Sequence, residues 1–302
     1  MSTKSGYAAI IGLPNVGKST LMNALLGQKI SITTAKPQTT RKRILGILSE
    51  ENSQIIFLDT PGILKPIYLL QEKMMDDVEL SIKDADVFVI IYDVSSIASL
   101  KESEENEIIK KIAEDESKKK ILVLNKIDTL AQEKTAALIE RYENTKQYFS
   151  VIPVSANKKF NLERIKNDII ECLPDGPKFY DDEIVSDETE RFFVTEIIRE
   201  KIFELYDDEV PYSCEVLIAE FKERQNAKDF VSAEIVVERE SQKPIIIGKA
   251  GRAIKELGEK SRKAIEDFLG KEVYLELRVK VRDKWRTNPN MLKSFGYIRD
   301  KE

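Results

Sequence analysis

The first half of the chain alternates short, uniformly apolar runs with segments of helical periodicity. The apolar runs, which predict strands, are Tyr7–Ile11, Gln54–Leu58, Val87–Tyr92, Ile121–Leu124 and Phe149–Val154. The segments with helical spacing are Lys18–Leu26, Tyr68–Lys83, Glu104–Ala113, Thr135–Tyr142 and Leu162–Leu173. Strands that are apolar on both faces and alternate with helices are typical of a mostly parallel sheet. We therefore predict an α/β domain over residues 1–173.

A different pattern follows a break in the chain. The sequence Pro174-Asp175-Gly176-Pro177 ends the last helix, so we place a linker at residues 174–187. Beyond it we predict a helix at Arg191–Tyr206, strands at Cys214–Phe221 and Ser232–Arg239, a short apolar segment at Pro244–Ile247, a helix at Arg252–Leu269 and a strand at Val273–Val281. This order indicates a small α+β domain over residues 188–302.

The composition narrows the chemistry that the chain can perform. With 302 residues there is room for about two domains, and 42% hydrophobic with 33% charged residues is typical of a globular protein. The chain contains no histidine, which excludes Ser-His-Asp catalysis and imidazole-ligated zinc. Cys172 and Cys214 lie far apart, which argues against a disulfide framework or a cysteine-based metal site.

The apolar runs also bear on localisation. All of them are far shorter than the roughly 18 residues needed to cross a bilayer, and the start of the chain lacks the pattern of a signal peptide. We therefore expect a cytoplasmic protein with no transmembrane segment. Separately, we expect a monomer.

Charge is distributed unevenly, although the net charge is only -5. Residues 181–240 carry 7 basic and 19 acidic side chains, whereas residues 241–302 carry 16 basic and 9 acidic ones. A basic block in an acidic protein suggests an anionic partner at that end. A solvated surface of ion pairs is the alternative interpretation.

One motif predicts a phosphate site near the amino end. It follows the first predicted strand, precedes the first predicted helix and matches GxxxxGK[ST]: Gly12, Leu13, Pro14, Asn15, Val16, Gly17, Lys18 and Ser19, with Thr20 next. Loop N–H groups and the helix N-terminus attract phosphate, Lys18 reaches the β- and γ-phosphates, and the Ser19 hydroxyl can ligate Mg²⁺. The alternative is a structural glycine turn.

A second motif follows another predicted strand, and consists of Asp59, Thr60, Pro61 and Gly62. Its position at the carboxyl end of a parallel strand is where ligands bind in such sheets. We expect Asp59 to hold Mg²⁺ through water and the Gly62 N–H to sense the γ-phosphate. By itself, DxxG is usually a turn.

A third pair of segments predicts recognition of the base. Asn125, Lys126, Ile127 and Asp128 follow one strand, and Ser155, Ala156 and Asn157 follow the next. The Asp128 carboxylate can accept hydrogen bonds from guanine N1–H and the exocyclic amine, which adenine does not offer. We expect Lys126 to lay its stem over the ring, Asn125 to brace the two loops, and the Ala156 N–H to meet O6. Together these residues favour GTP over ATP.

With these motifs in order, residues 7–173 resemble a Ras-like GTPase domain of the translation-factor class. Asn15 within GLPNVGKS, the run Pro37-Gln38-Thr39-Thr40-Arg41, and Ile63 after DTPG are similar to the Era family of bacterial GTPases. The resemblance implies slow GTP hydrolysis, GTP, GDP and Mg²⁺ as ligands, and Thr40 as the switch threonine on Mg²⁺. Thr39 remains possible.

The resemblance also bears on catalysis. Ras-like enzymes commonly orient the attacking water with a glutamine just after DxxG, but here that position is Ile63. Relatives with this substitution include potassium-activated members, so the resemblance implies K⁺ held by Asn15. The expected catalytic residues are Asn15, Lys18, Thr40 and Gly62. An Asn15 that only bonds within its own loop is the alternative.

The resemblance extends into the second domain, whose element order is similar to a type II KH domain over about Arg191–Val281. Such domains clamp single-stranded RNA with a GxxG loop. The residues that the resemblance assigns to RNA are Ile247, Gly248, Lys249, Ala250, Gly251, Arg252 and Lys255, with Lys260 and Arg262 available to phosphates. Lys280, Arg282, Lys284 and Arg286 would extend the basic surface. Trp285 either stacks on a base or, as we expect, packs against the domain.

The resemblance implies a GTP-hydrolysing switch that binds the 3′ end of 16S ribosomal RNA and assists maturation of the 30S subunit. The alternative is a membrane-associated regulatory GTPase, peripheral at the cytoplasmic face of the inner membrane, because a basic tail also suits anionic lipids. A third interpretation, an ATP-dependent kinase, requires no preference for guanine.

Overall fold

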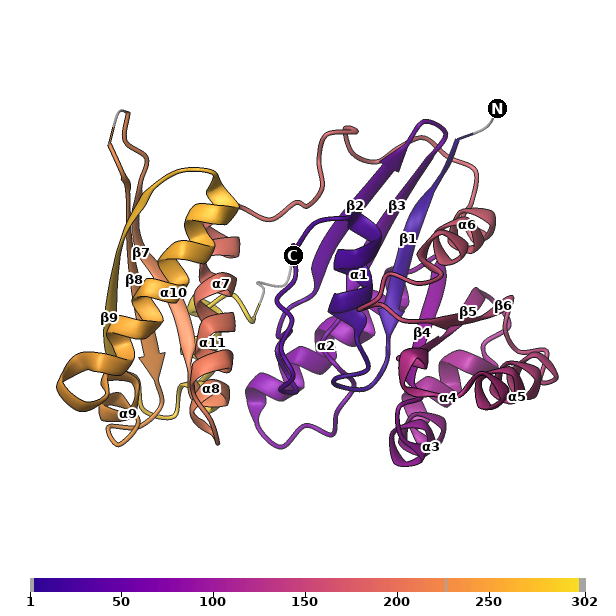
Figure 1. Cartoon of the computed structure of the whole chain (residues 1–302), viewed down its shortest axis with the longest axis horizontal. Coiled ribbons are helices and arrows are strands. Elements are labelled where there is room, and N and C mark those ends of the chain that lie inside the picture. The colour runs from indigo at the N-terminus through magenta and orange to yellow at the C-terminus, as the bar shows by residue number, and fades with distance from the viewer. Residues whose placement is uncertain (1–2, 226, 299–302) are drawn as a thin grey trace. The chain divides into compact units, whose positions relative to one another are not determined.

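The computed structural model describes residues 3–225 and 227–298. It divides into two compact units, which are Met1–Lys65 with Met74–Asp187, and Pro66–Lys73 with Glu188–Glu302 (Figure 1). The boundaries expected from the sequence, at residues 1–173, 174–187 and 188–302, stay a prediction.

The first unit is built on a six-stranded sheet with the order β2-β3-β1-β4-β5-β6. The strands predicted from the sequence are β1 (Lys4–Ile11), β3 (Ser53–Asp59), β4 (Val87–Asp93), β5 (Lys119–Asn125) and β6 (Ser150–Val154), and they pair in parallel. Every residue of β3 and β4 is buried, as is expected of strands covered on both faces. The predicted mostly parallel α/β fold is therefore confirmed.

One strand was not predicted. Strand β2 (Ile44–Glu50) pairs antiparallel with β3 at the edge of the sheet. Gly46 interrupts its apolar run, so the sequence shows no continuous strand signal there. A Cβ at Gly46 would lie 2.7 Å from Leu26 and 3.0 Å from the Met22 sulfur, so the glycine admits the close approach of the preceding helix.

Helices flank this sheet. They are α1 (Lys18–Leu26), α2 (Leu69–Asp84), α3 (Ile97–Glu105), α4 (Glu107–Glu114), α5 (Gln132–Glu143) and α6 (Leu162–Cys172). The single helix predicted at Glu104–Ala113 is in fact parts of α3 and α4. Asn106 separates them, and its Oδ1 caps α4 by accepting hydrogen bonds from the N–H groups of Ile108 and Ile109.

The segment expected to be a linker is hydrogen-bonded to the first unit. The Gln54 side chain accepts hydrogen bonds from the N–H groups of Phe179 (2.8 Å) and Tyr180 (3.0 Å), and donates one to the Tyr180 carbonyl. Further along, the Ile47 N–H donates to the Val185 carbonyl at 2.7 Å. Residues 179–185 are thus fixed along β2 and β3.

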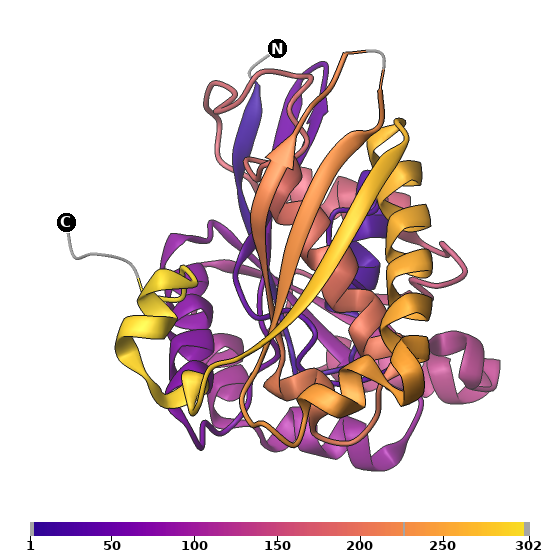
Figure 2. The same cartoon turned by 90° about the vertical axis from the view of Figure 1, so that its left-hand side faces the viewer.

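The second unit is a three-stranded sheet with helices packed on it. Its elements are α7 (Glu190–Leu205), α8 (Val210–Ser213), β7 (Glu215–Lys222), β8 (Asp229–Val237), α9 (Lys243–Ile247), α10 (Arg252–Leu269), β9 (Val273–Val281) and α11 (Pro289–Ser294). Strand β8 pairs antiparallel with β7 and parallel with β9. Helices α7 and α10 contact each other on one face of this sheet (Figure 2). The predicted α+β arrangement is confirmed.

Trp285 lies in a short 3₁₀ turn, Trp285–Thr287, after β9. Its side chain is fully buried, and the indole Nε1–H donates a hydrogen bond to the Ser213 carbonyl at 2.9 Å. The ring also packs edge-on against Phe295. Trp285 therefore packs against its domain, as expected.

None of the helices within residues 3–225 and 227–298 combines the length and the apolar character that spanning a membrane would need.

Candidate functional site: a nucleotide cavity and a glycine loop

The loop between β1 and α1 is held in a shape that few residues allow. Gly17 has φ 100° and ψ 26°, in the left-handed region where glycine is favoured. A Cβ at Gly17 would lie 2.3 Å from the Asn125 Nδ2, and one at Gly12 would lie 2.8 Å from the Ile91 carbonyl oxygen. Both glycines of the motif are therefore required by the closeness of neighbouring groups.

Lys18 is almost entirely buried in this loop. Its Nζ donates hydrogen bonds to the carbonyls of Gly12 (3.2 Å) and Leu13 (2.9 Å). Burial lowers the pKa of Lys18 to about 8, although the nearby Asp59 carboxylate opposes the shift. An ammonium this poorly solvated gains strongly from an anion, so the loop is suited to phosphate.

Oxygen atoms converge beside Lys18. The Ser19 hydroxyl donates to Asp59 Oδ2 at 2.7 Å and lies 2.9 Å from Thr40 Oγ1. The Ser31 hydroxyl donates to the same Asp59 oxygen at 2.9 Å. Burial raises the pKa of Asp59, and the hydrogen bond from Ser19 partly offsets the rise. Asp59 Oδ1 is buried and has no hydrogen-bond partner among the described residues.

A divalent cation fits this cluster. Mg²⁺ prefers hard oxygen ligands and keeps much of its water shell, so two hydroxyls and one carboxylate beside a phosphate form a suitable site. The unpartnered Asp59 oxygen supplies an acceptor for a metal-bound water. Ser31 had no motif to mark it in the sequence, and its role is visible only once the chain has folded.

The structure distinguishes the two candidate switch threonines. Thr40 Oγ1 reaches Ser19, whereas Thr39 Oγ1 donates to the Lys36 carbonyl at 2.9 Å and lies 3.1 Å from Thr34 Oγ1. Both side chains line the same cavity. The geometry favours Thr40 as the threonine nearest the proposed metal.

The DxxG segment packs directly on the phosphate loop. The Ile63 N–H donates to the Gly12 carbonyl at 3.1 Å, and the Thr60 hydroxyl donates to the Ile10 carbonyl at 2.8 Å. A Cβ at Gly62 would lie 2.6 Å from the Pro14 nitrogen. The Ile63 side chain is 2% exposed, so this residue does not present a group to an attacking water.

Asn125 joins three segments of the site. Its Nδ2 donates to the Val16 carbonyl at 2.8 Å, and its Oδ1 accepts from the Ala156 N–H at 3.1 Å. Asn125 thus lies between the loops as expected. The Ala156 N–H, which we expected to meet guanine O6, is bonded to Asn125 here, so that contact requires the N–H to be shared or released.

The acidic residue of the base-reading segment is available to a ligand. Asp128 lies in a 3₁₀ turn, Ile127–Thr129, and its carboxylate is exposed at the cavity with no hydrogen bond or ion pair to another described residue. Lys126 precedes the turn in a left-handed conformation, φ 69°. Its Nζ donates to the Asn15 carbonyl at 2.9 Å, which connects the base-reading segment to the phosphate loop.

These residues surround one cavity of about 490 Å³, a volume suited to a nucleotide-sized ligand. The lining includes most of the residues predicted from the sequence, namely Pro14, Asn15, Gly17, Lys18, Ser19, Thr20, Thr40, Gly62, Asn125, Lys126, Asp128, Ser155, Ala156 and Asn157. The remaining predicted residues, Gly12, Leu13, Val16, Asp59, Thr60, Pro61, Ile63 and Ile127, do not line it. Those that are buried, such as Val16 and Ile63, support the loops instead.

The GxxG loop lies in the second unit, between α9 and α10. Gly248 has φ 72° and ψ 173°, and Ala250 and Gly251 are left-handed at φ 53° and 75°. Lys249 and Arg252 are exposed at this loop, and neither has an ion pair with a described residue. Beneath the loop, the Tyr206 hydroxyl donates to the Ile246 carbonyl at 2.8 Å and anchors α9.

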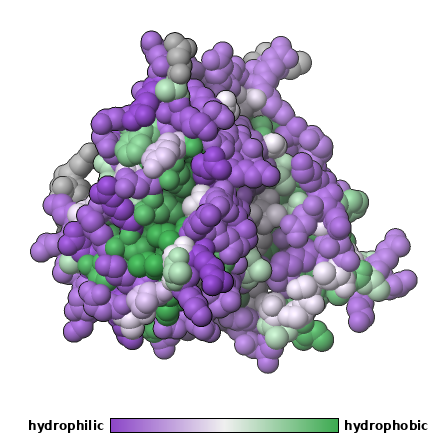
Figure 3. Space-filling view, turned by 60° about the vertical axis from the view of Figure 1, so that its left-hand side comes forward, coloured by the Kyte–Doolittle hydropathy of each residue, from purple (hydrophilic) through white to green (hydrophobic). Residues whose placement is uncertain are grey.

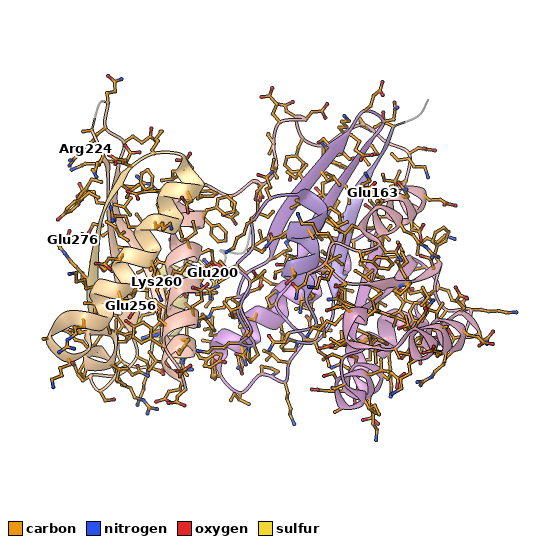
Figure 4. All side chains as sticks on the ribbon, in the orientation of Figure 1. Glu163, Glu200, Arg224, Glu256, Lys260 and Glu276 are labelled. Atoms are coloured by element: carbon orange, nitrogen blue, oxygen red, sulfur yellow. The ribbon has the colours of Figure 1, made fainter. Side chains whose placement is uncertain are left out.

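Several other basic residues expected to face RNA are instead paired with acidic ones. Lys260 lies 2.8 Å from Glu256 on the exposed face of α10 (Figure 4). The remaining pairs are Lys255 with Glu259 (3.9 Å), Arg262 with Glu266 (3.6 Å), Lys280 with Glu234, and Arg286 with Glu238. Acidic side chains therefore interrupt the expected basic surface, because strand register and helical spacing place glutamates beside these cations. The assignment of these residues to RNA stays a prediction. In Figure 3 the face is largely hydrophilic, with a main hydrophobic area left of centre and smaller ones toward the lower right.

Two family models match the chain. Residues 7–126 match the 50S ribosome-binding GTPase family, and residues 209–286 match the KH domain family. The first match contains the phosphate loop, and the second contains the GxxG loop.

Relatives extend the match over nearly the whole chain. A chloroplastic Era-like GTPase of Arabidopsis thaliana is 47% identical, over 97% of this chain and 69% of the relative. GTPase Era of Geotalea daltonii is 44% identical over 97% of each. Among solved structures, a variant of Aquifex aeolicus Era bound to GDP and AlF4⁻ matches with a TM-score of 0.90 and 38% identity, covering 98% of this chain and all of the other. Era in complex with MgGDPNP and nucleotides 1506–1542 of 16S ribosomal RNA matches with a TM-score of 0.89 at the same identity and coverage. The chain therefore belongs to the Era family of GTPases.

Proposed function

We propose that this GTPase binds the 3′ end of 16S ribosomal RNA through its GxxG loop and assists maturation of the 30S subunit. The observation that carries the proposal is a pair of exposed cations, Lys249 and Arg252, on a glycine-bounded loop at the start of α10. Neither forms an ion pair with a residue that the structure describes. Small residues at such a loop let an RNA backbone approach, and helix N–H groups and cations attract its phosphates. An Era of known structure is in complex with nucleotides 1506–1542 of 16S ribosomal RNA, which supports the choice of ligand.

In the first unit, the cavity binds GTP and GDP with Mg²⁺. Lys18 neutralises the β- and γ-phosphates, and the hydroxyls of Ser19 and Thr40 would hold the metal, with Asp59 accepting from its water. The metal, when bound, neutralises charge that develops on the phosphate oxygens. The Gly62 N–H marks the place where the γ-phosphate would be sensed.

Hydrolysis has to proceed without a glutamine after DxxG, because Ile63 occupies that position and is buried. Charge neutralisation can supply much of the acceleration of GTP hydrolysis, since phosphoryl transfer depends on positioning and electrostatics. We therefore propose that K⁺ at Asn15 provides an additional positive charge. In this structure the Asn15 Nδ2 donates to the Ala35 carbonyl at 3.0 Å, so the side chain lies between the phosphate loop and the segment before Thr40.

Comparing turnover in K⁺ with turnover in Na⁺ tests the potassium proposal. We expect GTP hydrolysis to be about tenfold faster in K⁺. We expect the Asn15→Ala variant to lose this difference while still binding GDP. Equal turnover in both salts, or an unchanged K⁺ effect in the variant, would show that Asn15 does not hold the cation.

The RNA proposal is tested against its main competitor, a membrane surface. The full chain is titrated, at matched salt, with a single-stranded RNA of the 16S 3′-terminal sequence and with vesicles containing anionic lipid. We expect tight binding to the RNA, weak binding to vesicles, and a cytoplasmic protein in fractionated cells. Preference for vesicles would instead support a regulatory GTPase at the inner membrane.

We further propose that nucleotide state alters how the second unit meets RNA. The segment after Gly62 supports this, because Pro66–Lys73 groups with the second unit although the motif itself belongs to the first. If the γ-phosphate orders the switch segments, the way in which the second unit is presented to RNA would then change. Crosslinking to ribosomal RNA with a GTP analogue or with GDP bound tests this, and identical crosslinks would contradict it.

A further inference from the structure

A carboxylate that belongs to none of the sequence motifs contacts Lys126, one of the residues that line the nucleotide cavity. Asp93 is the last residue of β4, the strand that leads to the same edge of the sheet as the phosphate loop. Its side chain is 9% exposed, and its Oδ2 lies 2.6 Å from the Lys126 Nζ. Its Oδ1 accepts a hydrogen bond from the Ser95 N–H at 2.9 Å. Asp93 is thus fixed by its own loop and directed at Lys126.

The Lys126 ammonium is held from two directions. One acceptor is Asp93, and the other is the Asn15 carbonyl of the phosphate loop at 2.9 Å. A free lysine side chain samples many rotamers, and holding its end removes most of that freedom before a ligand arrives. Of the two acceptors only Asp93 is charged, so it provides the stronger hydrogen bond.

The loops carrying the two residues are also joined by their backbones. The Val94 N–H donates to the Asn125 carbonyl at 3.1 Å, directly beside the ion pair. Lys126 itself has a left-handed backbone, φ 69°, which is costly for a residue with a side chain. The neighbouring contacts favour one conformation of Lys126, and this residue lines the cavity.

We propose that Asp93 is a positioning residue for purine binding: it holds the Lys126 ammonium so that the lysine stem forms a fixed surface for the face of the base. The inference rests on the proposed binding of guanine nucleotide in this cavity. It separates two tasks within the site. Asp93 and Lys126 act on the ring face, which guanine and xanthine share, whereas Asp128 acts on the ring edge, where they differ.

The test is the release of a fluorescent GDP from the Asp93→Asn variant, which keeps an oxygen for the Ser95 N–H but removes the charge. We expect release to become about tenfold faster, as for loss of a charge-assisted hydrogen bond. The ratio of GDP to XDP affinity should stay at the wild-type value, since the ring edge is untouched. A changed ratio would contradict the assignment to the ring face.

A double-mutant cycle separates positioning from general damage to the fold. In a Lys126→Met background, the Asp93→Asn change should have no further effect on GDP release. Asp86→Asn is the matched control, because Asp86 precedes the opposite end of β4 and its carboxylate accepts the Tyr7 N–H at 2.8 Å. We expect this control to release GDP at the wild-type rate.

Two further outcomes overturn the inference. One is GDP release at the wild-type rate from Asp93→Asn, and the other is an equal acceleration of release by Asp93→Asn with and without the Lys126 ammonium. Should Asp93→Asn not fold, Asp93→Ser in the same cycle gives the same contrast, because it also removes the charge. A wild-type protein that bound no GDP would instead overturn the proposed function itself.

Discussion

The two glycine loops of this protein differ in what surrounds them. In the first unit, Gly17 would clash with Asn125 if it carried a Cβ, and Lys18 is buried among loop carbonyls. In the second unit, a Cβ at Gly251 would meet no atom within 4 Å, and Lys249 is exposed. Only the left-handed backbone, φ 75°, favours glycine at position 251.

This difference indicates two kinds of ligand. A loop closed by neighbouring side chains fixes one phosphate group in one position, as catalysis requires. A loop open to solvent accepts the backbone of a longer strand in more than one register, and its affinity depends on exposed cations. Close neighbours therefore require glycine at position 17 and also at position 248, where a Cβ would lie 2.5 Å from the Ala253 Cβ. At position 251 only the backbone conformation favours glycine.

The largest effect should come from the base-reading residue of the closed site. We expect Asp128→Asn to weaken GDP binding by about 1,000-fold, because the amide no longer accepts two hydrogen bonds from guanine. Binding of XDP should improve, since xanthine presents an acceptor there. Calorimetry with both nucleotides measures this, and binding of RNA by the variant should be unchanged. Unaltered GDP affinity would show that Asp128 does not recognise the base.

RNA binding by the GxxG loop should depend on Lys249 and Arg252, which form no ion pair with a described residue. We expect the double change Lys249→Ala and Arg252→Ala to weaken binding of the 16S 3′-terminal RNA on the order of 30-fold and to reduce the salt dependence of binding. Lys260→Ala is the control, because Lys260 is already paired with Glu256 at 2.8 Å. Fluorescence anisotropy at several salt concentrations measures both variants. Equal losses in the two would mean that the whole surface, rather than the loop, binds RNA.

The smallest predicted effect concerns pH. The pKa of Lys18 in the ligand-free protein is lowered to about 8 by burial, and a bound phosphate should raise it. Below that pKa the ammonium is already charged, so GDP affinity should be constant there. Above it the affinity should fall as pH rises, by about fivefold over the next pH unit.

Lys18→Arg separates this effect from ionisation of the guanine itself, because the guanidinium keeps its charge throughout that range. Calorimetry on both proteins at matched pH gives the comparison. If GDP affinity changed with pH in the same way in the wild-type protein and in Lys18→Arg, the lysine would not titrate in that range.

The parts of the site that could be predicted from the sequence are those fixed by local spacing. The phosphate loop, Asp59, Asn125 and Asp128 each follow an apolar strand, and the parallel sheet brings the carboxyl ends of its strands to one edge. The α+β order of the second unit likewise followed from periodicity. Strand β2 could not be predicted in this way, because Gly46 breaks its apolar run.

Contacts between distant positions could not be read from the sequence. Ser31 reaches Asp59 from the loop after α1, where the Asn23 side chain hydrogen-bonds to the Ser31 backbone. Asp93 reaches Lys126 because the register of β4 and β5 pairs Asp93 with Asn125. The pairing of Lys280 with Glu234 likewise depends on the register of β8 and β9, and it gives an acidic neighbour to a cation that the sequence offered to RNA. A count of charges therefore overestimates the surface that remains available to a polyanion.

Asn125 has a practical consequence for engineering. The Asn125 side-chain amide hydrogen-bonds to both the Val16 carbonyl and the Ala156 N–H. Replacing the whole base-reading segment with that of another protein would therefore also disturb the phosphate loop. A redesign for another nucleobase should keep this amide and vary position 128 alone. The scaffold would then tolerate a new specificity without being rebuilt elsewhere.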